Sequence, residues 1–236
     1  METTSEIMGK AFDRSLNRWR REKVGPTLAL PAAPRRTHWT IAISREAGAG
    51  AGDIARVLAV RLGWEVYDRE LLEAIASATH VRTELLESVD EKHRHWLTTC
   101  VATLFGPKVV SSDQYACYLA ETVLALGIHG HCVIVGRGAA AILPPESTIR
   151  VRLVAPLADR VRRTMHKRNW SEGEARQYVE TTDKQRAGFA RARFHKEPGL
   201  FDVTINTSRF STDECVSVIE GIVRSKETGA LTSSSE

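Results

Sequence analysis

The sequence contains few cysteines and no long hydrophobic run. Four cysteines occur among 236 residues, and their spacings of 17, 15 and 83 residues match neither a zinc knuckle nor a disulfide framework. No stretch reaches the roughly 18 apolar residues of a membrane helix. The first residues also lack the apolar core of a secretory signal. We therefore expect a cytoplasmic protein without a membrane partner.

Charge of neither sign dominates, since 33 Lys and Arg stand against 29 Asp and Glu, for a net charge of +4. The distribution is uneven. Residues 156–196 hold 11 basic and 5 acidic side chains, so the remainder carries a net charge of −2. A basic segment on a near-neutral body indicates a local anionic ligand and no specific nucleic-acid partner. The alternative is a solvated basic helical face.

The two ends of the chain differ from its centre. Residues 1–38 form a predicted N-terminal helix and linker, and the helix carries an apolar stripe of Met8, Phe12, Leu16 and Trp19. Such a helix would pack on the body or on a second copy of the chain, so a homodimer through it is one expectation. Residues 226–236 are mostly polar and predict a flexible tail.

Short β-rich runs alternate with helical patterns through residues 39–225. Strands are predicted at 39–44, 65–67, 132–135, 149–154 and 202–206, and helices at 71–78, 90–104, 114–128, 157–168, 171–193 and 213–223. The uninterrupted apolar run 132–135 is typical of a strand covered on both faces. This alternation predicts one α/β domain built on a parallel sheet.

Three glycines, Gly48, Gly50 and Gly52, separate the first strand from a helix. Such a turn lets backbone N–H groups approach phosphate, and the helix dipole attracts the anion. One template is the dinucleotide turn G-x-G-x-x-G with an acid about 20 residues later. Asp68 lies at the position expected for that acid, which would favour an NAD-type oxidoreductase. However, Asp53 occupies the position of the third glycine.

The second template is the phosphate loop G-x-x-x-x-G-K-[ST]. With Gly50 as its second glycine, the first glycine becomes Arg45, the lysine becomes Ala51 and the hydroxyl residue becomes Gly52. The two residues that contact β/γ-phosphate and magnesium in that template are therefore missing. A purely structural turn is the third reading.

Arg137 directly follows the predicted strand 132–135. Ligands of open parallel sheets bind at the carboxyl ends of the strands, and an arginine there offers two parallel N–H groups to phosphate. A salt bridge to a helix is the alternative.

Asp183 and Arg186 share one face of the predicted helix 171–193 because they are three residues apart. Arg160, Arg163 and Arg193 would join that face if two helices fold back on each other. A mobile helical lid that carries arginines neutralises a phosphoryl group during transfer. A structural ion pair is the alternative.

In order along the chain, five segments resemble the cytidylate kinase-like family, a divergent branch of P-loop nucleoside monophosphate kinases. They are ISREAGAGAGDIARVLAVRLGWEVYDRELL, HCVIVGRGAAAIL, IRVRLVAPLADRV, ARQYVETTDKQRAGFARARF and FDVTINTSRFS. The resemblance implies a three-layer α/β/α P-loop fold over residues 39–225, with a five-stranded parallel sheet of order 2-3-1-4-5. It also implies a helical acceptor insert at about 69–130 and a helical lid at about 160–195.

The resemblance implies a transfer of the γ-phosphoryl group of ATP, with Mg²⁺, to CMP, dCMP or a related small acceptor. The implied donor-phosphate residues are Gly48, Ala49, Gly50, Ala51, Gly52 and Asp53. The implied acceptor residues are Asp68, Arg69, Arg137 and Asp183, and the implied catalytic residues are Arg45, Arg137, Arg186 and Asp183. Asp68 would also order a magnesium-bound water.

The chain departs from true cytidylate kinases at several positions. The loop lysine and hydroxyl are absent, and Arg45 is the candidate substitute for the lysine unless it pairs structurally with Glu46 or Asp68. Gly138 replaces the aspartate after the phosphate-binding arginine, and Val179 replaces a lid arginine. A nucleotide-binding regulatory or scaffold protein without catalysis is therefore the alternative function.

Overall fold

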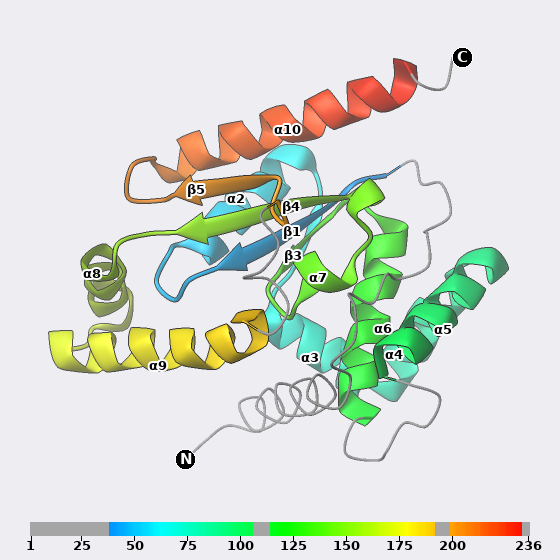
Figure 1. Cartoon of the computed structure of the whole chain (residues 1–236), viewed down its shortest axis with the longest axis horizontal. Coiled ribbons are helices and arrows are strands. Elements are labelled where there is room, and N and C mark those ends of the chain that lie inside the picture. Colours follow the sequence, from blue (N-terminus) through cyan, green and yellow to red (C-terminus); the bar gives the residue numbers. More distant parts are fainter. Residues whose placement is uncertain (1–37, 106–113, 192–198, 233–236) are drawn as a thin grey trace.

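Five short parallel strands form the central sheet of the computed structural model, which describes residues 38–105, 114–191 and 199–232 (Figure 1). The strands are β1 (Thr40–Arg45), β2 (Glu65–Tyr67), β3 (Cys132–Val135), β4 (Thr148–Val154) and β5 (Val203–Asn206). Their order is β2-β3-β1-β4-β5. The predicted α/β fold with sheet order 2-3-1-4-5 is confirmed.

The centre of the sheet is apolar on both faces. In β1, Ile41 pairs with Val133 of β3 on one side and with Ile149 of β4 on the other, and all three side chains are buried. Burial on both faces explains why β3 consists of consecutive apolar residues and shows no alternation.

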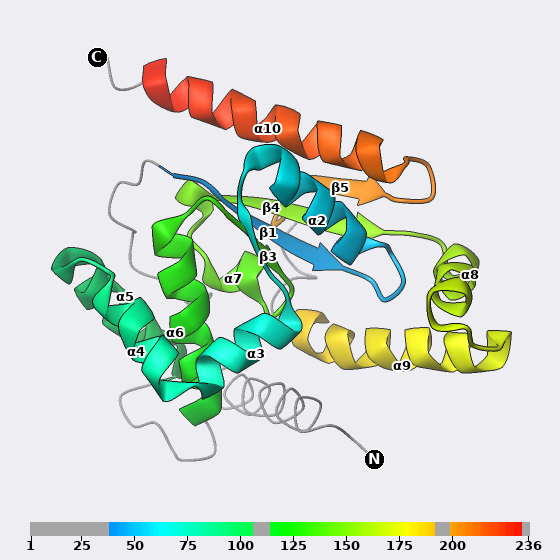
Figure 2. The same ribbon diagram turned by 180° about the vertical axis from the view of Figure 1, so that it is seen from behind.

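Helices cover both faces of this sheet. They are α2 (Ala51–Leu62), α3 (Arg69–Ser77), α4 (Thr79–Glu87), α5 (Glu91–Phe105), α6 (Gln114–His129), α7 (Ala139–Ile142), α8 (Leu157–Arg168), α9 (Glu172–Arg191) and α10 (Thr212–Thr232). Helices α2 and α10 pack against one face, through a core that includes Ile54, Leu58 and Ile219 (Figure 2).

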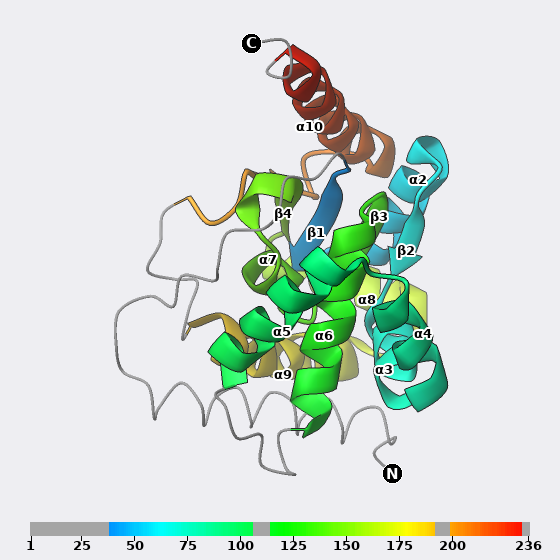
Figure 3. The ribbon, with the colours of Figure 1, turned by 90° about the vertical axis from the view of Figure 1, so that its right-hand side faces the viewer.

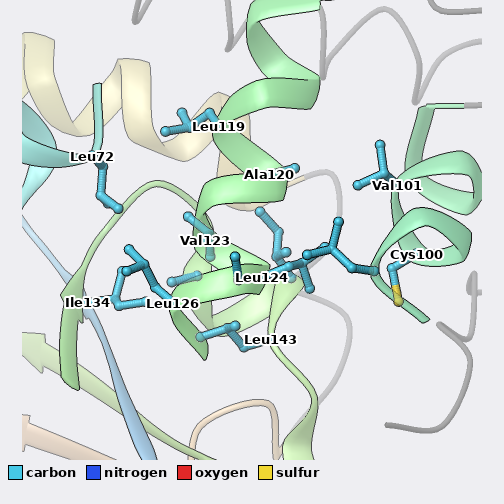
Figure 4. Close-up of a cluster of buried hydrophobic side chains, with 14 of the residues drawn as sticks. Leu72, Cys100, Val101, Leu119, Ala120, Val123, Leu124, Leu126, Ile134 and Leu143 are labelled. Atoms are coloured by element: carbon cyan, nitrogen blue, oxygen red, sulfur yellow. The ribbon is translucent and has the colours of Figure 1, made fainter. Parts of the chain in front are cut away.

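The opposite face holds a second core, between the sheet and helices α3 to α7. Its residues include Leu72 of α3, Val101 of α5 and the α6 residues Leu119, Val123 and Leu124 (Figure 4). Figure 3 shows α3 to α6 grouped away from α10. Helices α8 and α9 lie beyond the carboxyl ends of the strands, where β1 and β4 point toward them (Figure 1).

Several boundaries differ from the sequence prediction. Strand β1 continues to Arg45, because that residue still pairs with Leu153 of β4. The sequence analysis missed α4 and the four-residue helix α7. Helix α10 continues to Thr232, past the predicted end at residue 223. Residues 1–37, which hold the predicted N-terminal helix, lie outside the described residues. No described helix has the length and apolar character needed to span a membrane.

Candidate functional site

The glycine turn connects the end of β1 at Arg45 to the start of α2 at Ala51. Gly48 and Gly50 both have φ of +78°, a left-handed conformation that favours glycine. Gly48 is also required for space, because a Cβ there would lie 2.6 Å from the carbonyl oxygen of Arg160 in α8. A Cβ at Gly50 would meet nothing within 4 Å. The turn is therefore packed against α8 at Gly48 and open at Gly50.

The backbone amides of the turn fall into two groups. Those of Ala49 and Asp53, which we expected to bind phosphate, donate instead to the carbonyl oxygens of Glu46 and Gly50, at 3.3 and 3.2 Å. No acceptor is present within the described residues for the amides of Gly48, Gly50, Ala51 and Gly52. These four amides form the part of the turn that can receive an anion.

The carboxylate of Asp53 also has partners of its own. It accepts from Arg56 at 2.8 Å and lies 3.2 Å from Nζ of Lys167 in α8. Likewise, Glu46 Oε2 accepts from the amide of Ala155 at 3.1 Å and lies 3.4 Å from Arg160. Both acids therefore have compensating cations. Arg160 and Lys167 come from α8, more than 100 residues along the chain, and Arg56 lies three residues from Asp53.

Arg45 turns its guanidinium toward the end of β3. A Cβ at Gly136 would overlap Nη1 of Arg45, so the two residues are in direct contact. Burial, together with the charges of Arg186, Arg137 and Arg69, lowers the pKa of Arg45 to about 9, while Glu70 acts in the opposite direction. Neither Glu46 nor Asp68, the two structural partners we had considered for Arg45, bonds to it.

The turn after β3 has three successive residues with positive φ: Gly136 at +86°, Arg137 at +48° and Gly138 at +71°. A left-handed conformation is uncommon for arginine. The side chain of Arg137 is buried and pairs with the buried carboxylate of Glu73 in α3, and Arg69 Nε lies 3.1 Å from the same oxygen. The helix salt bridge that we held as the alternative for Arg137 is formed in the structure.

Asp68 ends the loop between β2 and α3 and caps α3. Its Oδ1 accepts from the amide of Leu71 at 3.0 Å. Its Oδ2 has no partner within the described chain.

Asp183 and Arg186 reach the turn from α9. Asp183 Oδ1 accepts from the amide of Ala47 at 2.8 Å, and its Oδ2 pairs with Nη1 of Arg160. Arg186 Nη1 donates to the carbonyl oxygen of Arg45 at 3.3 Å. Both residues thus contact the strand-to-helix turn, as one helix face should. Arg163 bonds instead to Thr207 at 2.8 Å, and Arg193 lies outside the described residues.

The structure therefore gathers the predicted arginines Arg45, Arg69, Arg137 and Arg186 near the glycine turn. Sequence analysis missed Glu73 and Gly136, and it did not assign Arg160 its contact with the turn. One signal was available for Glu73, which lies four residues after Arg69 on a helix. The described residues contain no group of three or more His, Cys, Asp or Glu side chains arranged for a metal ion.

Comparison with known proteins gives a family match and a fold match. A family model described as the cytidylate kinase-like family matches residues 40–209. The crystal structure of an uncharacterized protein from Eubacterium ventriosum is similar, with a TM-score of 0.54 and 19% identity, over 80% of this chain and 99% of that chain. At this identity the similarity shows the fold alone. TT1252 from Thermus thermophilus aligns over the same shares, with 19% identity and a TM-score of 0.42.

One curated protein is also similar over a short region. The uronate isomerase of Corynebacterium glutamicum is 32% identical over 91 residues, or 37% of this chain. The chain spans 18% of the length of that protein.

Proposed function

The chain belongs to the cytidylate kinase-like family over residues 40–209, and from this membership and its arginine cluster we propose that it is an ATP-dependent phosphotransferase. The acceptor we propose is a nucleoside monophosphate such as CMP or dCMP, or a related small phosphate ester. Donor and acceptor would meet at the carboxyl ends of β1 and β3, between the glycine turn and α9.

The observation that carries this proposal is the accumulation of positive charge at that edge. Burial, together with the nearby charges of Arg186, Arg137 and Arg69, lowers the pKa of Arg45 to about 9. Among the described residues, Glu70 and Glu73 supply opposite charge beside these arginines. A cluster of arginines is stabilised by a bound anion, and phosphate can accept two parallel N–H groups from the planar guanidinium.

The chain's own groups can position and neutralise the reactants, which is most of what phosphoryl transfer requires. The open amides of Gly48, Gly50, Ala51 and Gly52 would orient the donor phosphates at the start of α2. Arg45 would take the place of the absent loop lysine, and Arg186 would approach the transferring group from α9. Arg137 and Arg69, joined through Glu73, would hold the phosphate of the acceptor. No protein nucleophile is needed.

Magnesium would enter with ATP. Such sites keep several waters and use one or two carboxylates beside the substrate phosphates. Asp68 fits this role through water, because its Oδ2 has no protein partner in the described chain while Oδ1 fixes the side chain as the cap of α3. The ion would supply neutralisation of charge on the phosphates.

A coupled assay tests the proposal. Purified protein is mixed with ATP, Mg²⁺ and a panel of acceptors, with and without a pyrimidine base, because Gly138 leaves base recognition open. We expect turnover with at least one acceptor and loss of it in Arg186→Ala. Background turnover with every acceptor, from protein shown to be folded, would refute the proposal.

A nucleotide-binding module without catalysis is the second candidate. It is favoured by the missing lysine and hydroxyl at Ala51 and Gly52, and by the pairing of Arg137 with Glu73. Calorimetry that detects nucleotide binding without any transfer would support this second function. Measurable transfer would exclude it.

A further inference from the structure

We propose that Asp183 and Arg160 together form a clamp on the backbone of Ala47, which holds the glycine turn in its anion-binding shape before any ligand arrives. The role of this clamp in anion binding rests on the proposed function, whereas its contacts are present in the structure whatever the function is. In it Asp183 is a positioning residue, which acts on phosphate only through the turn.

The clamp grips both polar groups of one residue. Asp183 Oδ1 accepts from the amide of Ala47 at 2.8 Å, and Arg160 Nη1 donates to the carbonyl oxygen of Ala47 at 3.1 Å. Arg160 Nη1 also pairs with Asp183 Oδ2, so the two side chains hold each other in place. A fourth bond, from Arg160 Nε to the carbonyl oxygen of Ala155 at 2.8 Å, ties Arg160 to the end of β4.

Packing reinforces these bonds from the apolar side. The methyl group of Ala47 lies in a small buried cluster with Val161 of α8 and with Ala175 and Val179 of α9. Val179, where a lid arginine of true cytidylate kinases would stand, is therefore a packing residue that joins α9 to the turn. A charged side chain at position 179 that extended toward solvent or phosphate would disrupt this apolar cluster.

The next residue along the chain is fixed as well. A Cβ on Gly48 would lie 2.6 Å from the carbonyl oxygen and 3.0 Å from Cβ of Arg160, so the turn is in close contact with α8. Beyond that point the amides of Gly50, Ala51 and Gly52 are open. The fixed part of the turn thus directly precedes the part that can bind an anion.

The physical consequence is preorganisation. A loop that is ordered only by its ligand loses conformational entropy on binding, and this cost lowers affinity. Here the turn is already ordered when the chain folds, because the ion pair between α8 and α9 holds it, so ligand binding loses less conformational entropy. Such a clamp offsets part of what is lost with the lysine and the hydroxyl of the usual phosphate loop.

Three variants test the clamp. Asp183→Ala removes both bonds of the carboxylate, and Asp183→Asn keeps an oxygen for the amide of Ala47 but loses the charge that faces Arg160. Glu180→Ala is the matched control, because it removes a surface carboxylate from the same helix whose one ion pair among the described residues is with Arg176. Hydrogen exchange of the Ala47 amide, in protein without ligand, reports the clamp directly. Calorimetric binding of pyrophosphate and of ATP reports its effect.

We expect exchange at Ala47 to be slow in the wild type and in Glu180→Ala, and at least about tenfold faster in Asp183→Ala. Both dissociation constants should rise about tenfold in Asp183→Ala and by less in Asp183→Asn, with the control unchanged. Fast exchange in the wild type, or unchanged affinity in Asp183→Ala, would overturn the clamp. If the wild type binds neither ligand, the proposed function fails, and the exchange rates alone decide whether the clamp exists.

Discussion

The guanidinium of Arg45 lies directly against the Cα of Gly136, in the space that any side chain at position 136 would need. The last residue of β1 thereby contacts the first residue after β3, and these strands are neighbours in the sheet. Because Gly136 also has φ of +86°, the turn after β3 needs glycine for two independent reasons.

Gly136→Ala should impair anion binding beyond its effect on folding. We expect a loss of about 1–2 kcal/mol in unfolding free energy from the left-handed backbone, and an approximately tenfold weaker binding of ATP because Arg45 is displaced. Gly63→Ala is the matched control, since Gly63 has φ of +69° and an added Cβ there would meet nothing within 4 Å. Chemical denaturation and calorimetry measure the two effects. Equal ATP affinity in both variants would contradict the displacement of Arg45.

Arg45→Ala should lower the rate of phosphoryl transfer by about 10²-fold or more, and Arg45→Lys should recover only part of it. Stability should behave in the opposite way. The lowered pKa means that the fold disfavours the charged guanidinium, so its removal should leave the melting temperature unchanged or raise it. Pyrophosphate should raise the melting temperature of the wild type more than that of the variant. A variant that melts earlier but binds ATP normally would assign Arg45 a structural role.

Glu73→Ala should be strongly destabilising, because it leaves the buried guanidinium of Arg137 without its carboxylate. We expect a loss of about 3–5 kcal/mol, and a smaller loss for Glu73→Gln, which keeps one oxygen as an acceptor. Arg176→Ala, which removes exposed pairs with Glu172 and Glu180, should cost under about 1 kcal/mol. Urea denaturation compares the three variants. A cost for Glu73→Ala as small as that of the surface control would show that the buried pair contributes little.

Stability should decrease below neutral pH, in part through His131. Burial and the neighbouring ring of His38, whose centroid lies 4.2 Å away, lower the pKa of His131 below its usual 6.5. Below pH 6.5 the unfolded chain protonates His131 more readily than the folded chain does, so protonation stabilises the unfolded state. The contribution of His131 to stability is therefore full above pH 6.5 and is lost as the pH falls below that value. His131→Asn, which suits φ of +48°, should show a shallower decline between pH 7.5 and 5.5 in thermal melting. An identical slope would remove His131 from the explanation.

The sequence by itself determined the local features of this protein. The apolar run of β3 predicted a strand covered on both faces. Ser171 followed three residues later by Glu174 is a capping-box pattern, which is typical of a helix start. In the structure the amide of Ser171 donates to Glu174 Oε2 at 2.9 Å and its hydroxyl group lies 2.6 Å from the same oxygen. Such patterns depend on residues within a few positions of each other, so a single segment contains the whole signal.

Only the tertiary structure decided how the site is built. Ala47 and Asp183 are 136 residues apart, and nothing near either residue in the sequence indicates that they bond. The same holds for Arg45 with Gly136 and for Arg137 with Glu73, where each pair joins different elements at one edge of the sheet. Composition shows that arginines and carboxylates are present. Which carboxylate each arginine meets depends on helix packing against the sheet, because charge attraction is short-ranged in water and strong only where burial removes the solvent.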